Sequence, residues 1–440
     1  MALSPAEART AAAAGCPVDH EAIARAASGG SQASGDPHHG YEPFDLKDPF
    51  PAYAQLRRDE PVMYDERIGY WVVTRYDDVK STFENWETFS SENAQAPVRE
   101  RGPQATKIMK DGGFTAYSGL SARIPPEHTR IRAIAQRAFT PRRFKALEPT
   151  IRENTRKALE KMLANPERTG DFFAQVAYDI PTITILTLLG VDTSRVPTYK
   201  RWSDSRAAMT WGDLDDEQQV PHAHNLVEYW QECISLVTAA HAEGGNSFIA
   251  DLVTAQGDGA EISDHEIASL AYSLLFAGHE TTTTLIANCI RVLLSHREQW
   301  EQLVADPSGI AGAVDEVLRF SGSIVAWRRK ALKDTEIGGV AIPQGANILL
   351  VMGSANRDEN VFENPDAFDI TRADARNHLS FGFGIHYCLG NMLAKLQAKI
   401  ALEETLAAVP SLHLADDADI DFRENLSFRV PLSVPVTWEA

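Results

Sequence analysis

The chain has 440 residues, with 42 basic and 61 acidic side chains and a formal net charge of −19. A nucleic-acid-binding protein needs a basic surface that displaces counterions from phosphates, so this balance argues against that class of partner. Hydrophobic residues make up 44% and charged residues 23% of the chain, which is the ordinary composition of a globular protein with a large core.

The cysteines and the apolar segments predict a soluble, cytoplasmic protein. The cysteines are too few and too scattered for the disulfide framework of a secreted protein, and they suit a reducing compartment. They are Cys16, Cys233, Cys289 and Cys388. No segment approaches the about 18 consecutive apolar residues of a membrane-spanning helix. The start of the chain, MALSPAEART, lacks the basic and apolar regions of a signal peptide.

The N-terminal part of the chain changes character twice. Residues 1–40 are rich in alanine, glycine and serine, and we expect them to form a flexible tail. Between residues 61 and 76, two runs of β-forming residues flank a turn and predict a hairpin. From about residue 127 to 305, apolar residues recur at spacings of three and four, which predicts helices, the longest over 264–296.

The C-terminal part predicts strands and one further helix. Short, turn-punctuated runs follow residue 335, a helical run follows Cys388, and residues 426–438 are typical of a strand. A mostly helical body with minor strands at both ends predicts one large domain over residues 41–440. Its expected class is mainly α, with small antiparallel sheets.

The segment 381–390 reads Phe-Gly-Phe-Gly-Ile-His-Tyr-Cys-Leu-Gly, directly before the last predicted helix. A cysteine at a helix N-terminus faces unpaired N–H groups, which lower the thiol pKa and favour the metal-binding thiolate. The glycines would let the backbone turn tightly and approach a flat ligand. On the cysteine alone, a buried free thiol is the commoner interpretation.

As a whole, this segment resembles the haem-binding loop of the cytochrome P450 monooxygenases. The family pattern is Phe, Gly, any, Gly, any, Arg or His, any, Cys, any, Gly, and every specified position fits. In this family a cysteine thiolate binds the iron of haem. The resemblance implies the P450 fold, haem b as cofactor and Cys388 as the iron ligand. It also implies haem contacts from Phe381, Gly382 and Gly390, and a bond from His386 to a propionate.

A second motif is the pair Glu316 and Arg319, whose spacing places both side chains on one helical face. The same spacing recurs elsewhere in the chain, where a surface ion pair is the default interpretation. Here the pair precedes Cys388 by about 70 residues and is followed by PDAFDITR, residues 365–372. The resemblance implies a structural Glu-Arg-Arg triad that Arg372 completes.

Other polar residues match propionate-binding positions of the family. His128 and Arg132 lie four residues apart at the start of a predicted helix, although a polar helical face explains them equally well. Arg329 matches a further propionate-binding arginine. Arg328 beside it leaves this assignment uncertain by one residue.

The stretch Ala277-Gly278-His279-Glu280-Thr281-Thr282 lies in the middle of the longest predicted helix. Glycine and β-branched residues are poor helix formers, so we expect a local distortion there, as functional sites often have. Threonine hydroxyls that bond backbone carbonyls are the alternative explanation. The resemblance implies that Ala277 lies at the haem and that Glu280 and Thr281 supply protons for oxygen activation. It leaves His279 in a variable position, where we expect it to face outward.

Family position also predicts the substrate pocket. Its expected residues are Phe276, Ala277, Ile324, Val325, Ala326 and the tip at 429–432. They suit a small hydrophobic molecule. Several stretches are similar to the haem domains of self-sufficient bacterial members that are fused to phthalate-oxygenase-type reductases, although this chain lacks the fusion. This likeness favours hydroxylation or O-dealkylation of an aromatic substrate with O₂.

Electrons are expected from a separate ferredoxin or flavin/iron–sulfur reductase, and the protein is expected to be a monomer. A basic patch on the thiolate side would steer an acidic ferredoxin, although solvated basic residues are an equally good interpretation. Its expected members are Arg137, Arg142, Arg143, Lys145, Lys395 and Lys399. A peroxide-driven peroxygenase and a haem sensor without turnover stay open as alternatives.

Overall fold

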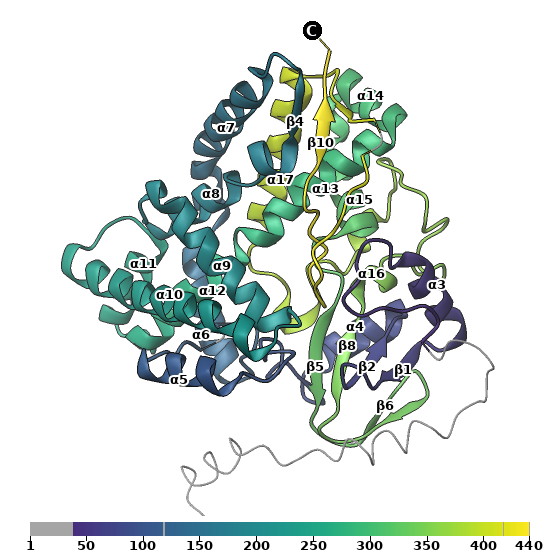
Figure 1. Cartoon of the computed structure of the whole chain (residues 1–440). Coiled ribbons are helices and arrows are strands. Elements are labelled where there is room, and N and C mark those ends of the chain that lie inside the picture. Colours follow the sequence, from purple (N-terminus) through teal and green to yellow (C-terminus); the bar gives the residue numbers. More distant parts are fainter. Residues whose placement is uncertain (1–37, 118, 417, 440) are drawn as a thin grey trace, which may run out of the picture.

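The computed structural model describes residues 38–117, 119–416 and 418–439. Figure 1 shows most helices gathered on one side, with the main sheet and helices α3 and α4 on the other. The helices are α3 (Phe50–Asp59), α4 (Tyr76–Glu84), α5 (Pro103–Asp111), α6 (Glu127–Ala138), α7 (Pro141–Leu163), α8 (Ile180–Leu189), α9 (Val196–Trp211), α10 (Asp216–Glu243), α11 (Phe248–Gly257), α12 (Asp264–Ala277), α13 (Glu280–Ser295), α14 (Arg297–Ala305), α15 (Ile310–Ser321), α16 (Met352–Ala355) and α17 (Asn391–Ala408). The short helical turns are η1 (Phe173–Ala177), η2 (Thr193–Arg195), η3 (Pro307–Gly309), η4 (Ala375–Asn377) and η5 (Gly384–His386). The strands are β1 (Val62–Asp65), β2 (Tyr70–Val73), β3 (Phe89–Ser90), β4 (Thr169–Asp171), β5 (Trp327–Ala331), β6 (Thr335–Ile337), β7 (Val340–Ile342), β8 (Asn347–Leu350), β9 (His413–Leu414) and β10 (Pro435–Thr437).

The predicted N-terminal tail, residues 1–40, lies outside the described residues except for its last three. These form a turn in which the amide of Tyr41 donates to the carbonyl of His38 at 2.8 Å. Tyr41, the first residue of the predicted domain, is buried. A single core cluster contains residues from Ile131 to Val436. The division at 41–440 stays a prediction, which this shared core favours.

The helical body forms over the predicted range, and α13 is its central element. Nearly all side chains of α13 are buried, which is typical of a helix inside the core of a large domain. Capping chemistry fixes the start of its neighbour α12. The Ser263 hydroxyl accepts from the amide of Glu266, and the Glu266 carboxylate accepts from the amide of Ser263. None of the helices in the described ranges is long and apolar enough to cross a membrane.

The predicted single helix over 264–296 is wrong in one respect, because it is broken between α12 and α13. The expected distortion lies at Gly278 and His279, where the amide of His279 bonds only three residues back, to Phe276. A Cβ at Gly278 would lie 2.8 Å from the Ile185 side chain and 2.9 Å from the Leu274 carbonyl, so the close packing requires glycine. The break presents Ala277 and Thr281 to a cavity.

The main sheet has the strand order β1-β2-β8-β5-β3. The predicted hairpin is confirmed as β1 and β2, with Val62 opposite Val73. The predicted mainly α class with small sheets is confirmed, and the strand pairs are antiparallel except that β2 pairs with β8 in parallel. Parallel pairing needs a long crossover, and here nearly the whole helical body separates the two strands in sequence. The smaller sheets, β4-β10-β9 and β6-β7, are antiparallel.

Candidate functional site

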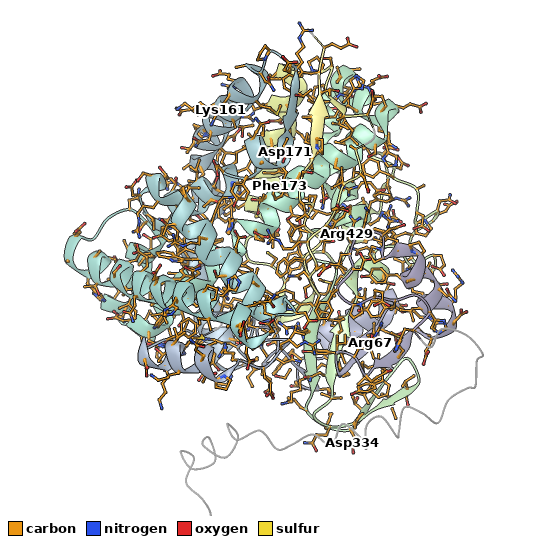
Figure 2. The ribbon with its side chains drawn as sticks, in the orientation of Figure 1. Arg67, Lys161, Asp171, Phe173, Asp334 and Arg429 are labelled. Atoms are coloured by element: carbon orange, nitrogen blue, oxygen red, sulfur yellow. The ribbon has the colours of Figure 1, made fainter. Side chains whose placement is uncertain are left out.

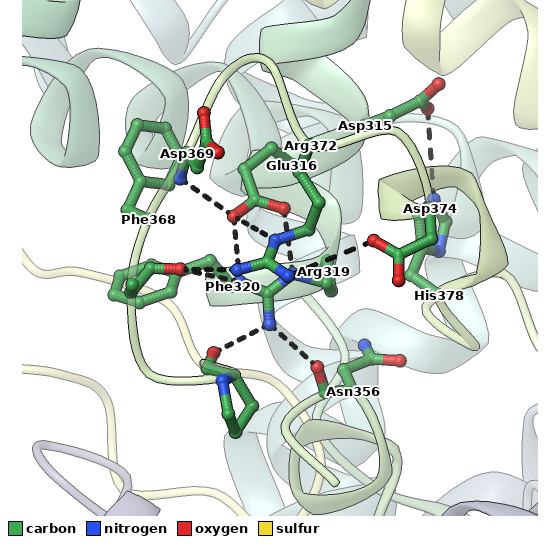
Figure 3. A network of polar contacts seen from close by, with 12 residues as sticks. Asp315, Glu316, Arg319, Phe320, Asn356, Phe368, Asp369, Arg372, Asp374 and His378 are labelled. Atoms are coloured by element: carbon green, nitrogen blue, oxygen red, sulfur yellow. Dashed lines mark hydrogen bonds and ion pairs between the residues drawn. The ribbon is translucent and has the colours of Figure 1, made fainter. Parts of the chain in front are cut away.

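The three predicted triad residues come together in the structure, as Figure 3 shows. Both Glu316 and Arg319 are fully buried, and two N–H groups of Arg319 each lie 2.7 Å from a Glu316 oxygen. Arg372 donates to Glu316 Oε1 at 3.2 Å. Further donors of Arg319 bond the carbonyls of Asn356 and Pro365. This network ties α15 to the segment that leads into the cysteine loop.

Glycines shape the cysteine loop. Gly382 and Gly384 both have φ of +70°, a left-handed conformation that glycine adopts without strain. A Cβ at Gly384 would lie 2.9 Å from the carbonyl oxygen of Phe83 in α4. The amide of Cys388 donates to the carbonyl of Phe381 at 3.0 Å and closes the loop. Cys388 lines the cavity, two residues before Gly390, the N-cap of α17.

The predicted lowering of the Cys388 pKa is wrong for the free thiol. Removal from bulk water raises the pKa of Cys388, and this effect exceeds the opposing bonds from the amides of Gly390 and Asn391 and the charge of Arg132. The helix-terminal amides are present as expected, but burial outweighs them. Among the described cysteines, Cys388 alone lines the cavity, whereas Cys233 and Cys289 are buried in helices.

The cavity lies between the α12–α13 break and the cysteine loop. Ala277, Gly278, Thr281 and Thr282 line it on one side, and the loop residues line it on the other. Those loop residues are Phe381, Gly382, Phe383, His386, Cys388, Leu389 and Gly390. All the haem-loop positions predicted from the sequence thus face one space.

One end of the cavity gathers imidazole and guanidinium groups. The rings of His128 and His386 lie 4.2 Å apart between centroids, and both ring nitrogens of His128 are buried without a partner in the described chain. Arg132, Arg329 and His386 line the cavity, and His128 lies just behind them. Burial lowers the pKa of His128 to about 4 and that of His386 to about 2, and the nearby arginines add to both shifts.

The choice between Arg328 and Arg329 follows from the alternation of β5, which points the two side chains to opposite faces. Arg328 donates to the carbonyls of Ala94 and Ala96 and does not line the cavity. Arg329 lines it, and its Nε and Nη2 have no partner within the described ranges. Burial lowers the pKa of Arg329 to about 9. Nη1 donates to the Arg328 carbonyl, so Nε and Nη2 are the donors left for a ligand.

Glu280 and Thr281 point in different directions. Thr281 lines the cavity, and its hydroxyl donates to the Ala277 carbonyl at 3.0 Å. Glu280 is 6% exposed, is absent from the cavity wall and accepts from Arg423 Nη1 at 2.7 Å. The expectation that His279 faces outward is wrong, since it is buried with Nε2 3.7 Å from a Glu280 oxygen. Burial lowers the pKa of His279 to about 4.

Two α9 residues adjoin this group, Lys200 buried and Asp204 partly exposed. Asp204 Oδ1 lies 3.6 Å from the same nitrogen of Arg423, and Lys200 donates to the Tyr178 carbonyl. Burial raises the pKa of Asp204 to about 6 and lowers that of Lys200 to about 7. Sequence reasoning missed both residues and Arg423, because nothing in the sequence connects α9 with the C-terminal segment.

The residues expected to form the substrate pocket divide between the cavity wall and the core. Phe276, Ala277 and Ile324 line the cavity, but Val325 and Ala326 do not. Val325 packs against Gly353 and its amide donates to the Ser427 carbonyl, while Ala326 belongs to a separate core cluster behind the sheet. These contacts use both side chains in core packing, between the cavity-lining residues Ile324 and Trp327.

The tip at 429–432 was also expected to face the pocket, but none of its residues lines the cavity. Arg429, labelled in Figure 2, is buried and donates to the carbonyls of Leu46 and Lys47. Leu432 is exposed to solvent. Phe428, just before the predicted tip, lines the cavity instead.

An aromatic cluster forms part of the wall. Phe276 stacks on Trp211 at 5.3 Å between centroids, and Phe428 meets Trp211 edge-on at 4.7 Å. Trp327 completes the cluster at 6.0 Å from Trp211. Because Phe276, Trp327 and Phe428 line the cavity, its surface suits a flat aromatic molecule. Trp327 and Phe428 were missed, although aromatic residues beside the predicted pocket segments were a usable signal.

Comparison with known proteins identifies the class. The family model for cytochrome P450 matches residues 68–306 and 310–426, so the chain belongs to this family. It is a haem-thiolate monooxygenase, an oxidoreductase whose relatives use haem b. The 6-deoxyerythronolide B hydroxylase of Saccharopolyspora erythraea is 33% identical over 389 residues, which cover 87% of this chain and 94% of that protein.

Solved structures agree with the fold. Cytochrome P450 CREJ in complex with (4-ethylphenyl) dihydrogen phosphate is 75% identical, with a TM-score of 0.90, and the match covers 91% of this chain and 100% of that chain. The Acinetobacter radioresistens CYP116B5 heme domain is 31% identical, with a TM-score of 0.87 over 91% of this chain and 98% of that chain.

The residues present fit a haem. Its two propionates need donors at one edge, and the unpartnered nitrogens of His128 and Arg329 lie together there with Arg132 and His386. Its flat ring needs a close approach of the backbone, which Gly382 and Gly390 allow because no atom lies within 4 Å of a Cβ placed there. Its iron needs a thiolate, and Cys388 lines the same cavity.

Proposed function

We propose that this protein inserts one oxygen atom of O₂ into a compact alkyl-aromatic substrate, specifically an alkylphenyl phosphate. The reaction consumes the substrate, O₂, two electrons and two protons, and it yields the hydroxylated product and water. The observation that carries the proposal is the aromatic cavity wall between Thr281 and Cys388. The phosphate class is supported by CREJ, which is 75% identical and was solved with (4-ethylphenyl) dihydrogen phosphate.

The chain's residues divide the work of this reaction. Bound haem supplies the reductive activation of O₂. Cys388 is proposed to bind its iron, while Arg132, Arg329, His386 and His128 bind and neutralise its propionates. Thr281 places a hydroxyl on the cavity wall, where it can hold and pass a proton. Glu280 is proposed to bring protons to Thr281 from the Arg423 and Asp204 side.

Electrons are proposed to come from an acidic ferredoxin. A hollow with an apolar floor lies between α7, α15 and α17, beside the start of α17 that follows Cys388. Lys145 and Lys399 border it, and the exposed Met392 lies within it. Three predicted members of the basic patch contribute less, since Arg143 pairs with Asp251 at 2.7 Å, Lys395 with Asp315, and Lys399 with Glu403 at 3.5 Å. Arg137, Arg142 and Lys145 are exposed and form no ion pair among the described residues.

The test is product formation from 4-ethylphenyl phosphate by the haem-loaded enzyme with a ferredoxin and its reductase. We expect a hydroxylated product whose new oxygen carries the label of ¹⁸O₂. Product formation with hydrogen peroxide alone would instead support a peroxygenase. Tight binding without product under both conditions would support a sensor and overturn the proposal. In the same preparation, Cys388→Ala is expected to lose the red-shifted thiolate band of the reduced carbon monoxide complex.

A further inference from the structure

Arg206 is a buried cation on the cavity wall whose role lies outside haem binding. It belongs to α9 and is 4% exposed. Its Nη1 donates to the Tyr272 carbonyl at 2.7 Å, and its Nη2 donates to Gln95 Oε1 at 3.1 Å. Its guanidinium also lies over the rings of Tyr272 and Phe276, at 4.2 and 4.9 Å. All these partners are neutral.

No carboxylate in the described parts of the chain forms an ion pair with Arg206. Arg319 and Arg357 have such partners, Glu316 and Asp366. The buried Arg328 and Arg429 bond backbone carbonyls instead, but unlike Arg206 neither lines the cavity. Removing a charge from water without an opposite charge is costly, so a cation of this kind is typical of an anion-binding site. Because Arg206 faces the cavity, the missing opposite charge can come from a bound ligand.

The haem does not account for this cation. The cavity wall carries three arginines: Arg132, Arg206 and Arg329. His386 lies at the edge of the cavity expected to bind the propionates. The charges of Arg132 and Arg329 help to lower the pKa of His386, and Arg206 is not among the residues that do so. Arg206 instead packs on α12 through Tyr272 and Phe276, which precede the Ala277–Thr281 break. Two arginines therefore suit the two propionates, and the third remains for the substrate.

Polar groups surround Arg206 on the same wall. Gln95, which accepts from Arg206, donates through Nε2 to the Ser121 hydroxyl at 3.1 Å. The Ser273 hydroxyl is buried on the cavity wall and has no hydrogen-bond partner in the described ranges. It adjoins Tyr272, whose carbonyl holds Arg206. A guanidinium and a hydroxyl are donors that a phosphate group accepts from readily.

We propose that Arg206, together with Gln95 and Ser273, forms an anion subsite that binds the phosphate group of an aryl phosphate. This inference rests on the proposed function and names the residues that select its substrate. Arg206 lies over the ring of Phe276, Thr281 follows five residues later across the α12–α13 break, and both Phe276 and Thr281 line the cavity. A phosphate at Arg206 would thus leave the aromatic ring against Phe276 and direct the para-alkyl group to Thr281, so the alkyl carbon is the one hydroxylated.

The experiment measures the substrate-induced spin shift of the haem-loaded enzyme with 4-ethylphenyl phosphate and with 4-ethylphenol. We expect the wild type to bind the phosphate about 100-fold more tightly than the phenol, since a buried charge-assisted contact contributes on this scale. Arg206→Gln should remove this preference and leave phenol binding within about twofold, and Arg206→Lys should restore part of it. Arg201→Gln, an exposed position of the same helix that pairs with Glu228, is the matched control and should change neither affinity.

Equal affinity of the wild type for the two ligands, or an Arg206→Gln enzyme that keeps the preference, would overturn the subsite. If Arg206→Gln does not retain haem, Ser273→Ala decides the question. We expect it to weaken phosphate binding about tenfold and phenol binding not at all, and an unchanged phosphate affinity counts against the proposal. Selective binding of the phosphate without any product would instead contradict the proposed function and leave the subsite intact. The two proposals can therefore fail independently.

Discussion

Arg423 Nη1 lies 2.7 Å from Glu280 Oε1, so a residue of the C-terminal segment holds the acid of the predicted oxygen-activating motif. The contact keeps the Glu280 carboxylate on the side of the α12–α13 break that faces away from the cavity, while Thr281 faces into it. Asp204 lies 3.6 Å from the same nitrogen, and its side chain is 43% exposed. The three residues form a polar chain from the solvent to Glu280, the residue before Thr281.

Replacing Glu280 by glutamine tests this connection. Glutamine keeps an oxygen that can accept from Arg423 but cannot carry a proton, so turnover should fall about 100-fold, within the usual range for loss of an acid–base group. The substrate-induced spin shift and the rate of the first reduction should stay as in the wild type. Glu301→Gln, at an exposed acid on α14, is the control. Unchanged turnover with unchanged oxygen consumption would exclude Glu280 from proton delivery.

Lys200 gives the folded protein a pH-dependent stability. Its side chain is 3% exposed, and burial lowers its pKa to about 7, although Asp179, Glu280 and Asp204 favour the charged form and Arg423 opposes it. Unfolded lysine has a pKa of about 10.4. Between these two values the unfolded state binds more protons than the folded state, so this group makes the free energy of unfolding rise from about pH 7 to about pH 10.

The change that removes this effect is Lys200→Met. We expect the variant to be more stable than the wild type at pH 7, because a buried ammonium group is replaced by an apolar chain of similar length. Its free energy of unfolding should also rise less between pH 7 and 9.5. Urea unfolding at several pH values measures both, with Lys161→Met, at an exposed site on α7, as control. If the free energy of unfolding rose equally with pH in the variant and the wild type, Lys200 could not have the lowered pKa in the folded protein.

Sequence patterns predicted the parts of the site whose residues are neighbours along the chain. The loop at 381–390, the pair Glu316 and Arg319, and the distortion near Gly278 all follow from local spacing and propensity. The direction of individual side chains did not follow. Val325 and Ala326 are taken up by packing against Gly353 and by the core cluster behind the sheet, and His279 is buried at the helix break.

Contacts between distant segments could not be predicted from one sequence. Glu280 and Arg423 are 143 positions apart, and Arg206 meets Gln95 across 111 positions. Asp204 lies only two residues before Arg206 in the sequence, but in the fold it pairs with Arg423. The role proposed for Arg206 follows only from the fold, which places this arginine on the cavity wall without a carboxylate partner.

The buried triad should contribute strongly to stability. Glu316→Gln removes the negative charge between Arg319 and Arg372, both of which remain buried. Breaking a buried ion pair from one side costs about 3–5 kcal/mol. The exposed pair Arg297 and Glu301 offers a matched control, where Glu301→Gln should cost less than about 0.5 kcal/mol. Equal losses in chemical unfolding of the two variants would mean that the triad is not a stabilising element.

The docking hollow is tested by reversing charges at its exposed border. Arg142→Glu combined with Lys145→Glu should slow reduction by an acidic ferredoxin about tenfold at low salt, because such rim charges act mainly on association. The difference should vanish at high salt, where the Debye length is only about 3 Å. Arg143 is left in place, since it also bonds the Ala138 carbonyl. If the variant and the wild type were reduced at the same rate at low salt, this surface would not be the docking site of the ferredoxin.

The two left-handed glycines of the cysteine loop should differ in their tolerance of alanine. Both have φ of +70°, so a side chain at either position adds backbone strain of roughly 1–2 kcal/mol. No atom lies within 4 Å of a Cβ at Gly382, whereas a Cβ at Gly384 would lie 2.9 Å from the Phe83 carbonyl. Backbone cannot rotate away as a flexible side chain can, so Gly384→Ala must also move the loop away from α4.

We therefore expect Gly382→Ala to lower the free energy of unfolding by the strain alone and to keep the thiolate band of the reduced carbon monoxide complex. Gly384→Ala should lose most of that band, because the displaced loop carries both His386 and Cys388. Haem content and the carbon monoxide spectrum of the two variants measure the difference. An equal effect of the two substitutions would show that the packing of the loop against α4 does not position the cysteine.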